Sequence, residues 1–307
     1  SIGHDWGGDF ALYVDQAQAI VNADLEGLYQ KNKFTVDYSS RLQGPYLYPM
    51  GYPLLLSPLV AALGLNFFWL KIFTSIFFYL GLIVLFLNFK KSFKDAYSPL
   101  WIVSLIAFSD HYLFHGDQIL SDFPFFFFCF LSLFLFKKEV KVKRQILLGF
   151  LIFFTFLIRD LGALLLVSLF VFQFFNSNWK VLIKSQIYTY ITFGLLLILS
   201  FIVFPFGSKN HYELFINKLG WESFTDNLEY YLSIFEMFYR GAENNPWLEY
   251  IMLALVLFGM MLSFKRHLHF ISFFILGLIV LLLWPYHQSI RFLFPFIPLC
   301  LFFMLQG

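Results

Sequence analysis

Charged residues are scarce in this chain of 307 residues. Asp, Glu, Lys and Arg together make up 13%, against the roughly 25% of ordinary soluble domains. Hydrophobic residues reach 60%, with 46 Phe among them, and the mean hydropathy is +0.72. Long apolar runs between short charged stretches are what bilayer-spanning helices require. The composition therefore excludes an ordinary soluble domain and predicts an all-α polytopic membrane protein.

The chain also lacks the motifs of several common sites. Both of its cysteines, Cys129 and Cys300, lie inside apolar runs, which indicates small apolar side chains and not a disulfide or a metal site. It contains no CxxC, no HExxH, no Gly-rich phosphate loop and no evident nucleic-acid patch.

One group of potential metal ligands falls within thirteen residues: Asp110, His111, His115, Asp117 and Asp122. Their spacing is loose for a metal motif and favours a hydrated loop, and Asp122 also suits a cap on the helix that follows it. We assign no metal ligand and no certain cofactor. Whether a divalent ion binds is left open.

Acidic residues are nearly absent from the short charged stretches between the apolar runs. The runs lie at 66–88, 97–114, 122–136, 145–158, 161–176, 186–205, 248–264, 270–284 and 292–305. Basic stretches at 90–95, 137–144, 180–184 and 265–266 hold twelve of the 21 Lys and Arg but only two of the 19 acids. Short positive loops stay in the cytoplasm. Because every alternate loop obeys this rule, we predict about nine transmembrane helices.

The region 145–176 has basic residues on both flanks and Arg159, Asp160 and Gly162 in its middle. As one helix it would be about 48 Å long, too long for one ordinary span. A single crossing would also put one basic flank outside. We therefore predict a hairpin of two short helices with these three residues at its outer turn.

The other acids lie on the outer face, mainly in a first loop at 1–50 and a second at 206–247. We interpret 1–307 as one transmembrane domain of the inner or plasma membrane, with an active site facing away from the cytoplasm. Since the first loop has no span before it, we expect an N-terminal span to be missing, and the C-terminus to be truncated too.

Interfacial helices are expected in or beside both outer loops. Residues 52–64 are too short and too rich in Pro for a clean span, so we predict that they lie along the interface. Apolar positions from Leu228 to Phe238 predict an amphipathic helix in the second loop. Such an apolar stripe more often serves packing than carbohydrate binding.

The first segment that contains candidate catalytic residues is GGDFALYVDQAQAIVN at 7–22. Apolar residues with helical spacing follow Asp9, which puts this carboxylate where an N-cap belongs. A helix N-terminus also favours an ionised carboxylate, which suits an acid that must accept a proton. Tyr13 lies one turn further on the same face. Asp9 is thus both a candidate cap and a candidate catalytic residue.

The segment GPYLYPMGYPLLLSP at 44–58, which includes Tyr48, alternates aromatics with Pro and Gly before an apolar run. Aromatic side chains anchor at the headgroup level, so a plain anchor accounts for much of this pattern. An aromatic wall stiffened by prolines is also a suitable surface for a sugar or a polyprenyl chain.

These segments resemble membrane glycosyltransferases of the GT-C superfamily. The similarity is to the dolichyl-phosphate-mannose–protein mannosyltransferase type and its bacterial relatives, including the aminoarabinose transferase of lipid A. DFALY followed by YPMGYPLLLSPL is similar to the D-E-x-x-Y loop and the Y-P-P-G-Y-P segment of that family. ILSDFPFFFF, FLIRDLGALLL and HQSIRFLFPFIPL are similar to its S-[DE]-x-x-F, T-R-P-E-G and H-x-x-R-Y-x-x-P segments.

The resemblance implies a GT-C-like bundle that transfers a sugar from a polyprenyl-phosphate carrier to a lipid, glycan or protein acceptor. The catalytic acid of the family corresponds to Asp9. The second acid of its first loop is Phe10 here, and Asp160 replaces the Pro and Glu of the turn only loosely. Membrane lipids are expected as further partners, and nucleic acid is not.

The chemistry of such a transfer calls for cations beside the departing phosphate. Outer-face candidates are Arg41, Lys71, Arg159, His287 and Arg291. From these, and from the tyrosines above, we select Tyr13, Tyr48, Arg159, His287 and Arg291 as the donor-binding residues. We expect His287 and Arg291 to lie one helical turn apart. Arg291 could instead only reach headgroups, and Arg159 could only pair with Asp160.

Two other functions remain open at this stage. Loss of the second loop acid is compatible with a non-catalytic GT-C-fold protein in envelope polysaccharide assembly. A lipid or polysaccharide carrier would place its ionisable residues at mid-membrane. Here the charged residues lie at the outer rim of nearly pure Phe, Leu and Ile runs, which disfavours transport.

Overall fold

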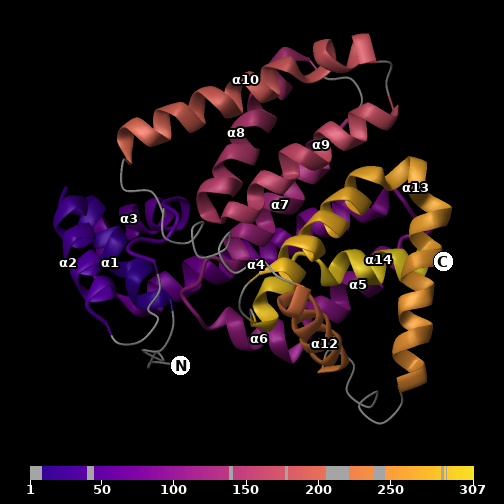
Figure 1. Cartoon of the computed structure of the whole chain (residues 1–307), viewed down its shortest axis with the longest axis horizontal. Helices are drawn as coiled ribbons and strands as arrows, with labels where there is room; N and C mark the ends of the chain where they lie inside the picture. The colour runs from indigo at the N-terminus through magenta and orange to yellow at the C-terminus, as the bar shows by residue number, and fades with distance from the viewer. Residues whose placement is uncertain are drawn as a thin grey trace.

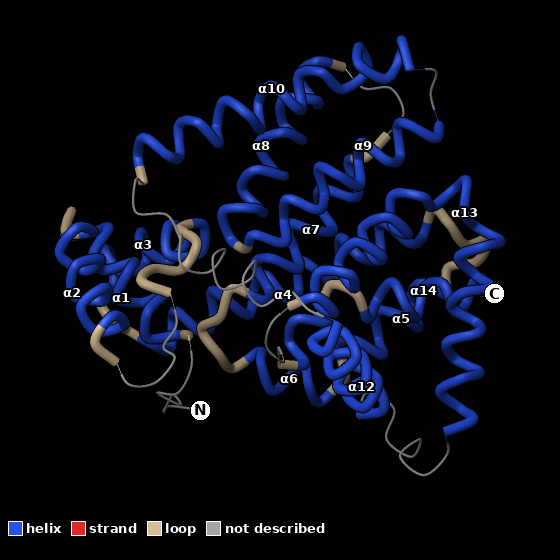
Figure 2. The backbone as a smooth tube through the Cα atoms, in the orientation of Figure 1, coloured by secondary structure: helices blue, strands red, loops and turns tan. Residues whose placement is uncertain are grey.

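Every regular element in the part of the chain that the structure describes is a helix. The computed structural model describes residues 9–39, 45–137, 141–176, 179–204, 221–237, 246–284, 287 and 289–307 (Figure 1). Figure 2 shows helices joined by short loops across these ranges. The predicted all-α class is therefore confirmed.

Most predicted apolar runs form helices, but the runs 97–114 and 292–305 are each divided between two helical segments. The bounds of the helices are α1 Phe10–Val21, α2 Leu25–Asp37, α3 Gly51–Leu63, α4 Phe67–Lys90, α5 Tyr97–Ala107, α6 Asp110–Gly116, α7 Asp122–Leu135, α8 Val142–Ile158, η1 Asp160–Gly162, α9 Ala163–Asn176, α10 Trp179–Val203, α12 Trp221–Met237, α13 Pro246–Leu283, η2 Ile290–Leu293 and α14 Ile297–Gln306.

Among the described residues, three helical stretches are long and apolar enough to cross a membrane: Phe67–Lys90, Gln186–Val203 and Tyr250–Leu283. The last is interrupted at His267, whose φ of −119° and ψ of 26° break α13 between the predicted runs 248–264 and 270–284. Helices α5, α7, α9 and α14 are apolar but shorter. About nine crossings therefore stays a prediction.

The turn between α8 and α9 lies where the sequence predicts it. Arg159 is extended, with φ −152° and ψ 138°, and η1 then leads into α9. A Cβ atom on Gly162 would lie 2.5 Å from the Thr155 carbonyl carbon. Only a glycine lets the chain reverse this close to the end of α8.

Helix α3 packs against other helices of the bundle and does not lie only on the surface. Tyr52, Leu56 and Val60 are buried, and the Tyr52 hydroxyl lies 2.6 Å from the Thr74 hydroxyl of α4. The segment before α3 is fixed to α1, because the amide of Gln16 exchanges two hydrogen bonds of 2.9 Å with the backbone of Tyr48. Figure 1 shows α1, α2 and α3 grouped on the left.

The predicted amphipathic helix of the second loop is present as α12. Its Asn227 is buried and donates from Nδ2 to the carbonyl oxygens of Leu282 and Trp284, at 3.0 and 2.6 Å. These carbonyls belong to the C-terminal end of α13, which lacks intrahelical partners for them. Residues 205–220 and 238–245 lie outside the described residues.

Basic stretches far apart in the sequence meet at one end of the molecule. Arg266 donates to the Lys91 carbonyl at 2.9 Å, and Gln186 donates to the Lys137 carbonyl at 3.1 Å. The charge of Arg144 also acts on Lys91. We call the region of Lys91, Lys137, Arg144 and Arg266 the lysine-rich end. The 14 residues of α7 separate Asp122 from it by about 20 Å.

The close approach at Gly162 gives a stability prediction. We expect Gly162→Ala to lower the free energy of unfolding by about 1–3 kcal/mol, because the added methyl group has no space against α8. Gly194→Ala in α10 is the matched control, since no atom lies within 4 Å of its added Cβ. It should leave stability unchanged or raise it by up to about 1 kcal/mol. Thermal unfolding in detergent measures both, and equal effects would contradict the tight turn.

Candidate functional site

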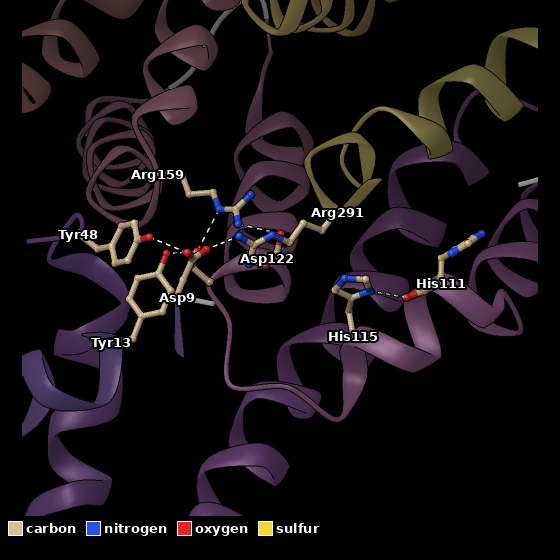
Figure 3. A network of polar contacts seen from close by, with 9 residues as sticks. Asp9, Tyr13, Tyr48, His111, His115, Asp122, Arg159 and Arg291 are labelled. Atoms are coloured by element: carbon tan, nitrogen blue, oxygen red, sulfur yellow. Dashed lines mark hydrogen bonds and ion pairs between the residues drawn. The ribbon is translucent and has the colours of Figure 1, made fainter. Parts of the chain in front are cut away.

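Asp9 occupies the N-cap position of α1, as predicted, but its side chain makes no capping hydrogen bond. Instead its carboxylate turns toward residues distant in the sequence. The Tyr48 hydroxyl donates to Oδ1 at 2.5 Å, and the Arg291 guanidinium pairs with Oδ2 (Figure 3). The carboxylate is therefore held by α1, by the segment before α3 and by η2. A simple capping role does not account for it.

A second carboxylate, Asp122, lies beside the first pair. Arg159 approaches its Oδ1 at 2.8 Å, and Arg291 approaches its Oδ2 at 3.7 Å. The Arg159 Nε donates to the Ser121 hydroxyl at 3.0 Å, and the Tyr13 hydroxyl lies 2.9 Å from the same oxygen. Arg291 thus links two carboxylates, and Ser121 links Arg159 to Tyr13.

Packing of the η2 segment against α6 fixes the position of Arg291. The ring of Tyr112 stacks on Phe294 with centroids 4.1 Å apart, and its hydroxyl donates to the Phe294 carbonyl at 2.7 Å. Phe292 contributes its ring face to the Arg159 guanidinium, 4.6 Å from the centroid. Both arginines are therefore held by aromatic contacts as well as by charge.

The site combines two carboxylates with two guanidinium groups away from bulk water. The side chain of Asp122 is 1% exposed and that of Arg159 is 10% exposed, whereas Arg291 and Asp9 keep 16% and 20%. Burial of unpaired charges at this depth would be costly, so each needs a partner. The more exposed pair, Asp9 and Arg291, is the part of the network that a ligand can reach.

The electrostatics favour an ionised Asp9. Burial on its own raises the pKa of this carboxyl, but the Arg291 charge and the Tyr48 hydrogen bond outweigh it, and the pKa is below the usual 3.8. Burial raises the pKa of Tyr13 to about 12. The pKa of Tyr48 is raised as well, by burial and by the Asp9 charge. Both phenols are therefore neutral hydrogen-bonding groups at neutral pH.

Five of the six residues selected from the sequence meet in this network, and His287 is the exception. Asp9, Tyr13, Tyr48, Arg159 and Arg291 converge, as Figure 3 shows.

His287 is exposed, and its ring stacks on Tyr230 of α12 with centroids 4.2 Å apart. The expected α-helical turn between His287 and Arg291 is absent, because Arg291 lies in the 3₁₀ segment η2 and α14 begins only at Ile297. The two residues therefore do not share a helix face.

Two residues of the network were not selected from the sequence, Ser121 and Asp122. Asp122 had suggested a helix cap, but α7 begins at Asp122 itself, and the residue that precedes it makes no side-chain cap. The available signal was the S-D pair of ILSDFPFFFF, directly before an apolar run. Arg159, for which a local pair with Asp160 was the alternative, forms an ion pair with Asp122.

The remaining polar candidates lie elsewhere. Lys71 pairs with Asp117 at 3.1 Å, and the His115 Nδ1 lies 2.9 Å from the carbonyl oxygen of His111. Among the described residues no three His, Cys, Asp or Glu are grouped as metal ligands. Arg41 lies outside the described residues. Whether a divalent ion binds stays open.

The lowered pKa of Asp9 predicts a pH dependence of stability. Because the folded-state pKa lies below the usual 3.8, this carboxylate contributes stability that is complete above pH 3.8 and is lost as the pH falls through the folded pKa. Wild-type protein should lose more thermal stability below pH 3.8 than Asp9→Asn does. Differential scanning fluorimetry in detergent measures this. Parallel profiles for the two proteins would mean that the Asp9 pair does not stabilise the fold.

No family model, no curated protein and no solved structure matches the chain. What this site can do is therefore argued from the chemistry of its own residues.

Proposed function

We propose that the protein is a membrane glycosyltransferase of GT-C type, which moves a sugar from a polyprenyl phosphate to a hydroxyl acceptor on the extracytoplasmic face. The observation that carries the proposal is the meeting of Asp9 with Arg291, which are 282 positions apart in the sequence. A carboxylate base beside a guanidinium group is what displacement of a sugar phosphate requires.

The position of the site along the bundle supports the proposed orientation. The network of Asp9, Asp122, Arg159 and Arg291 lies at the N-terminal end of α7, and the lysine-rich end lies beyond its C-terminal end. In a bilayer the lysine-rich end would face the cytoplasm. The site would then open to the opposite leaflet, in a bundle of about nine crossings.

The proposed reaction needs one proton acceptor and one anion-binding group. Asp9 takes the proton of the acceptor hydroxyl as its oxygen forms a bond with the anomeric carbon. The bond from that carbon to the phosphate oxygen breaks, and polyprenyl phosphate leaves with the electron pair. Attack opposite to the leaving group inverts the anomeric configuration. Arg291, with Arg159 behind it, stabilises the negative charge that develops on the phosphate.

Donor binding would also activate the base. Arg291 pairs with Asp9 and helps to keep the pKa of Asp9 low, which makes it a weak base. A donor phosphate competes for the same guanidinium and neutralises part of its charge. The pKa of Asp9 then rises, so that its carboxylate accepts a proton more readily. Binding of the donor would therefore make Asp9 a stronger base.

The tyrosines beside Asp9, Tyr13 and Tyr48, would offer the sugar an apolar contact through their rings and a polar contact through a hydroxyl. The rings of Tyr13 and Tyr48 lie 4.8 Å apart, and the hydroxyl of Tyr48 points at the carboxylate. Neutral phenols next to a base can orient a sugar hydroxyl without competing for its proton.

A non-catalytic GT-C-fold protein is the second candidate, and one observation favours it. Asp9 and Arg291 neutralise each other's charge directly, as a purely structural ion pair would. Such a protein would bind no polyprenyl-phosphate sugar and form no glycosidic product.

Substitution of Asp9 tests the chemical step. We expect Asp9→Asn to lower transfer from polyprenyl-phosphate sugars at least about 100-fold, because an amide cannot accept the acceptor proton. Asp15→Asn is the matched control, since Asp15 is an exposed acid on the same helix. Product formation by purified protein is measured by mass spectrometry, with size-exclusion chromatography to check folding. Undiminished turnover in Asp9→Asn would remove this carboxylate from the mechanism.

Substitution of Arg291 tests donor binding. Arg291→Lys keeps a positive charge but loses the bidentate geometry, whereas Arg291→Ala loses both. We expect the KM for the donor to rise in the order wild type, Arg291→Lys, Arg291→Ala, with the acceptor KM unchanged. Initial rates at varied donor and acceptor concentrations give both constants. Equal donor KM values in all three proteins would assign Arg291 a structural role only.

A further inference from the structure

The lysine-rich end holds positive charge that no described carboxylate neutralises. Burial and the charges of Lys137 and Arg144 lower the pKa of Lys91, whose ammonium lies 3.8 Å from the centroid of the Phe134 ring. Among the described residues, no Asp or Glu forms an ion pair with Lys91, Lys137 or Arg144. The charges of Lys137 and Arg144 act on Lys91 repulsively, which favours a bound anion.

A buried donor without a partner lies in the same place. The Nε atom of Arg144 is inaccessible and has no hydrogen-bond partner in the structure. Arg144 belongs to the first turn of α8, which contains no acid, and the Lys141 side chain at its N-cap makes no capping bond. The first amides of a helix lack intrahelical acceptors and carry partial positive charge. The basic side chains and the N-terminal end of α8 therefore both favour an anionic ligand.

We propose that the lysine-rich end binds the phosphate headgroup of an anionic phospholipid between α4 and the N-terminus of α8, with Lys91 and Arg144 as its principal ligands. Basic pockets between membrane helices bind such headgroups elsewhere. The proposal concerns the end of the molecule opposite Asp9 and does not rest on the proposed transfer reaction.

The surroundings of Arg144 favour a lipid over a soluble phosphate. Helix α8 exposes Val142, Ile146 and Phe150 at four-residue spacing, each 45–46% accessible. Residues four apart lie on one face of a helix, so these side chains form an apolar stripe that begins beside the charged turn. An acyl chain can follow this stripe while its headgroup stays at the cations. Inorganic phosphate would gain nothing from it.

The test compares two double variants with the same loss of charge. Purified protein in neutral detergent is titrated with dioctanoyl phosphatidylglycerol, and native mass spectrometry gives the bound fraction. Lys91→Gln with Arg144→Gln should weaken binding by about tenfold or more, in line with the loss of two basic contacts. Lys94→Gln with Lys143→Gln is the matched control, because both lysines are exposed and lie in the same two stretches. It should bind as the wild type does.

Three outcomes would overturn the proposal. Equal losses in both double variants would mean diffuse attraction in place of a defined site. Equal binding of dioctanoyl phosphatidylcholine would remove the preference for an anionic headgroup. Effective competition by equimolar inorganic phosphate or by a polyprenyl phosphate would assign the site to a different phosphate source. If the first variant fails to fold, Lys91→Gln alone with rescue by Lys91→Arg provides the same comparison.

Discussion

The contact between Asp9 and Arg291 is the constraint on which the rest of the site depends. A carboxylate and a guanidinium group that are mostly removed from water must pair, and here the partners come from the two ends of the chain. Once they meet, the segment before α3 follows through Tyr48, and α7 and the α8–α9 turn follow through Asp122 and Arg159. One electrostatic network thus fixes the relative position of five separate segments.

The two ends of the bundle differ in charge, and this difference bears on the function proposed for the network. The mixed network at the N-terminal end of α7 is neutral as a set, with two acids and two bases, and is partly accessible through Asp9 and Arg291. At the lysine-rich end, no described Asp or Glu forms an ion pair with Lys91, Lys137 or Arg144. A bilayer distinguishes such ends, because cytoplasmic loops favour Lys and Arg. The same asymmetry supports a transfer site at one end and, independently, a lipid contact at the other.

Sequence patterns predicted the helices far better than they predicted side-chain partners. The apolar runs gave the positions of α4, α7 and both halves of α13, and the charged interruption gave the turn at Arg159. The predictions of side-chain partners were wrong where they rested only on the spacing of residues close in the sequence. Asp122 resembled a helix cap, yet it pairs with Arg159, 37 positions away. His287 was placed beside Arg291 by assuming an α-helix where the chain forms a 3₁₀ turn. Periodicity carries information on the local backbone, whereas buried ion pairs depend on the tertiary fold.

The central claim is that Asp9 and Arg291 interact directly, and a double-mutant cycle measures that interaction. The free energy of unfolding in detergent is determined for wild type, Asp9→Asn, Arg291→Gln and the double variant. The ion pair predicts a coupling energy of about 1–3 kcal/mol, as found for contacting residues in one network. Additivity within about 0.5 kcal/mol, the behaviour of distant independent sites, would contradict it.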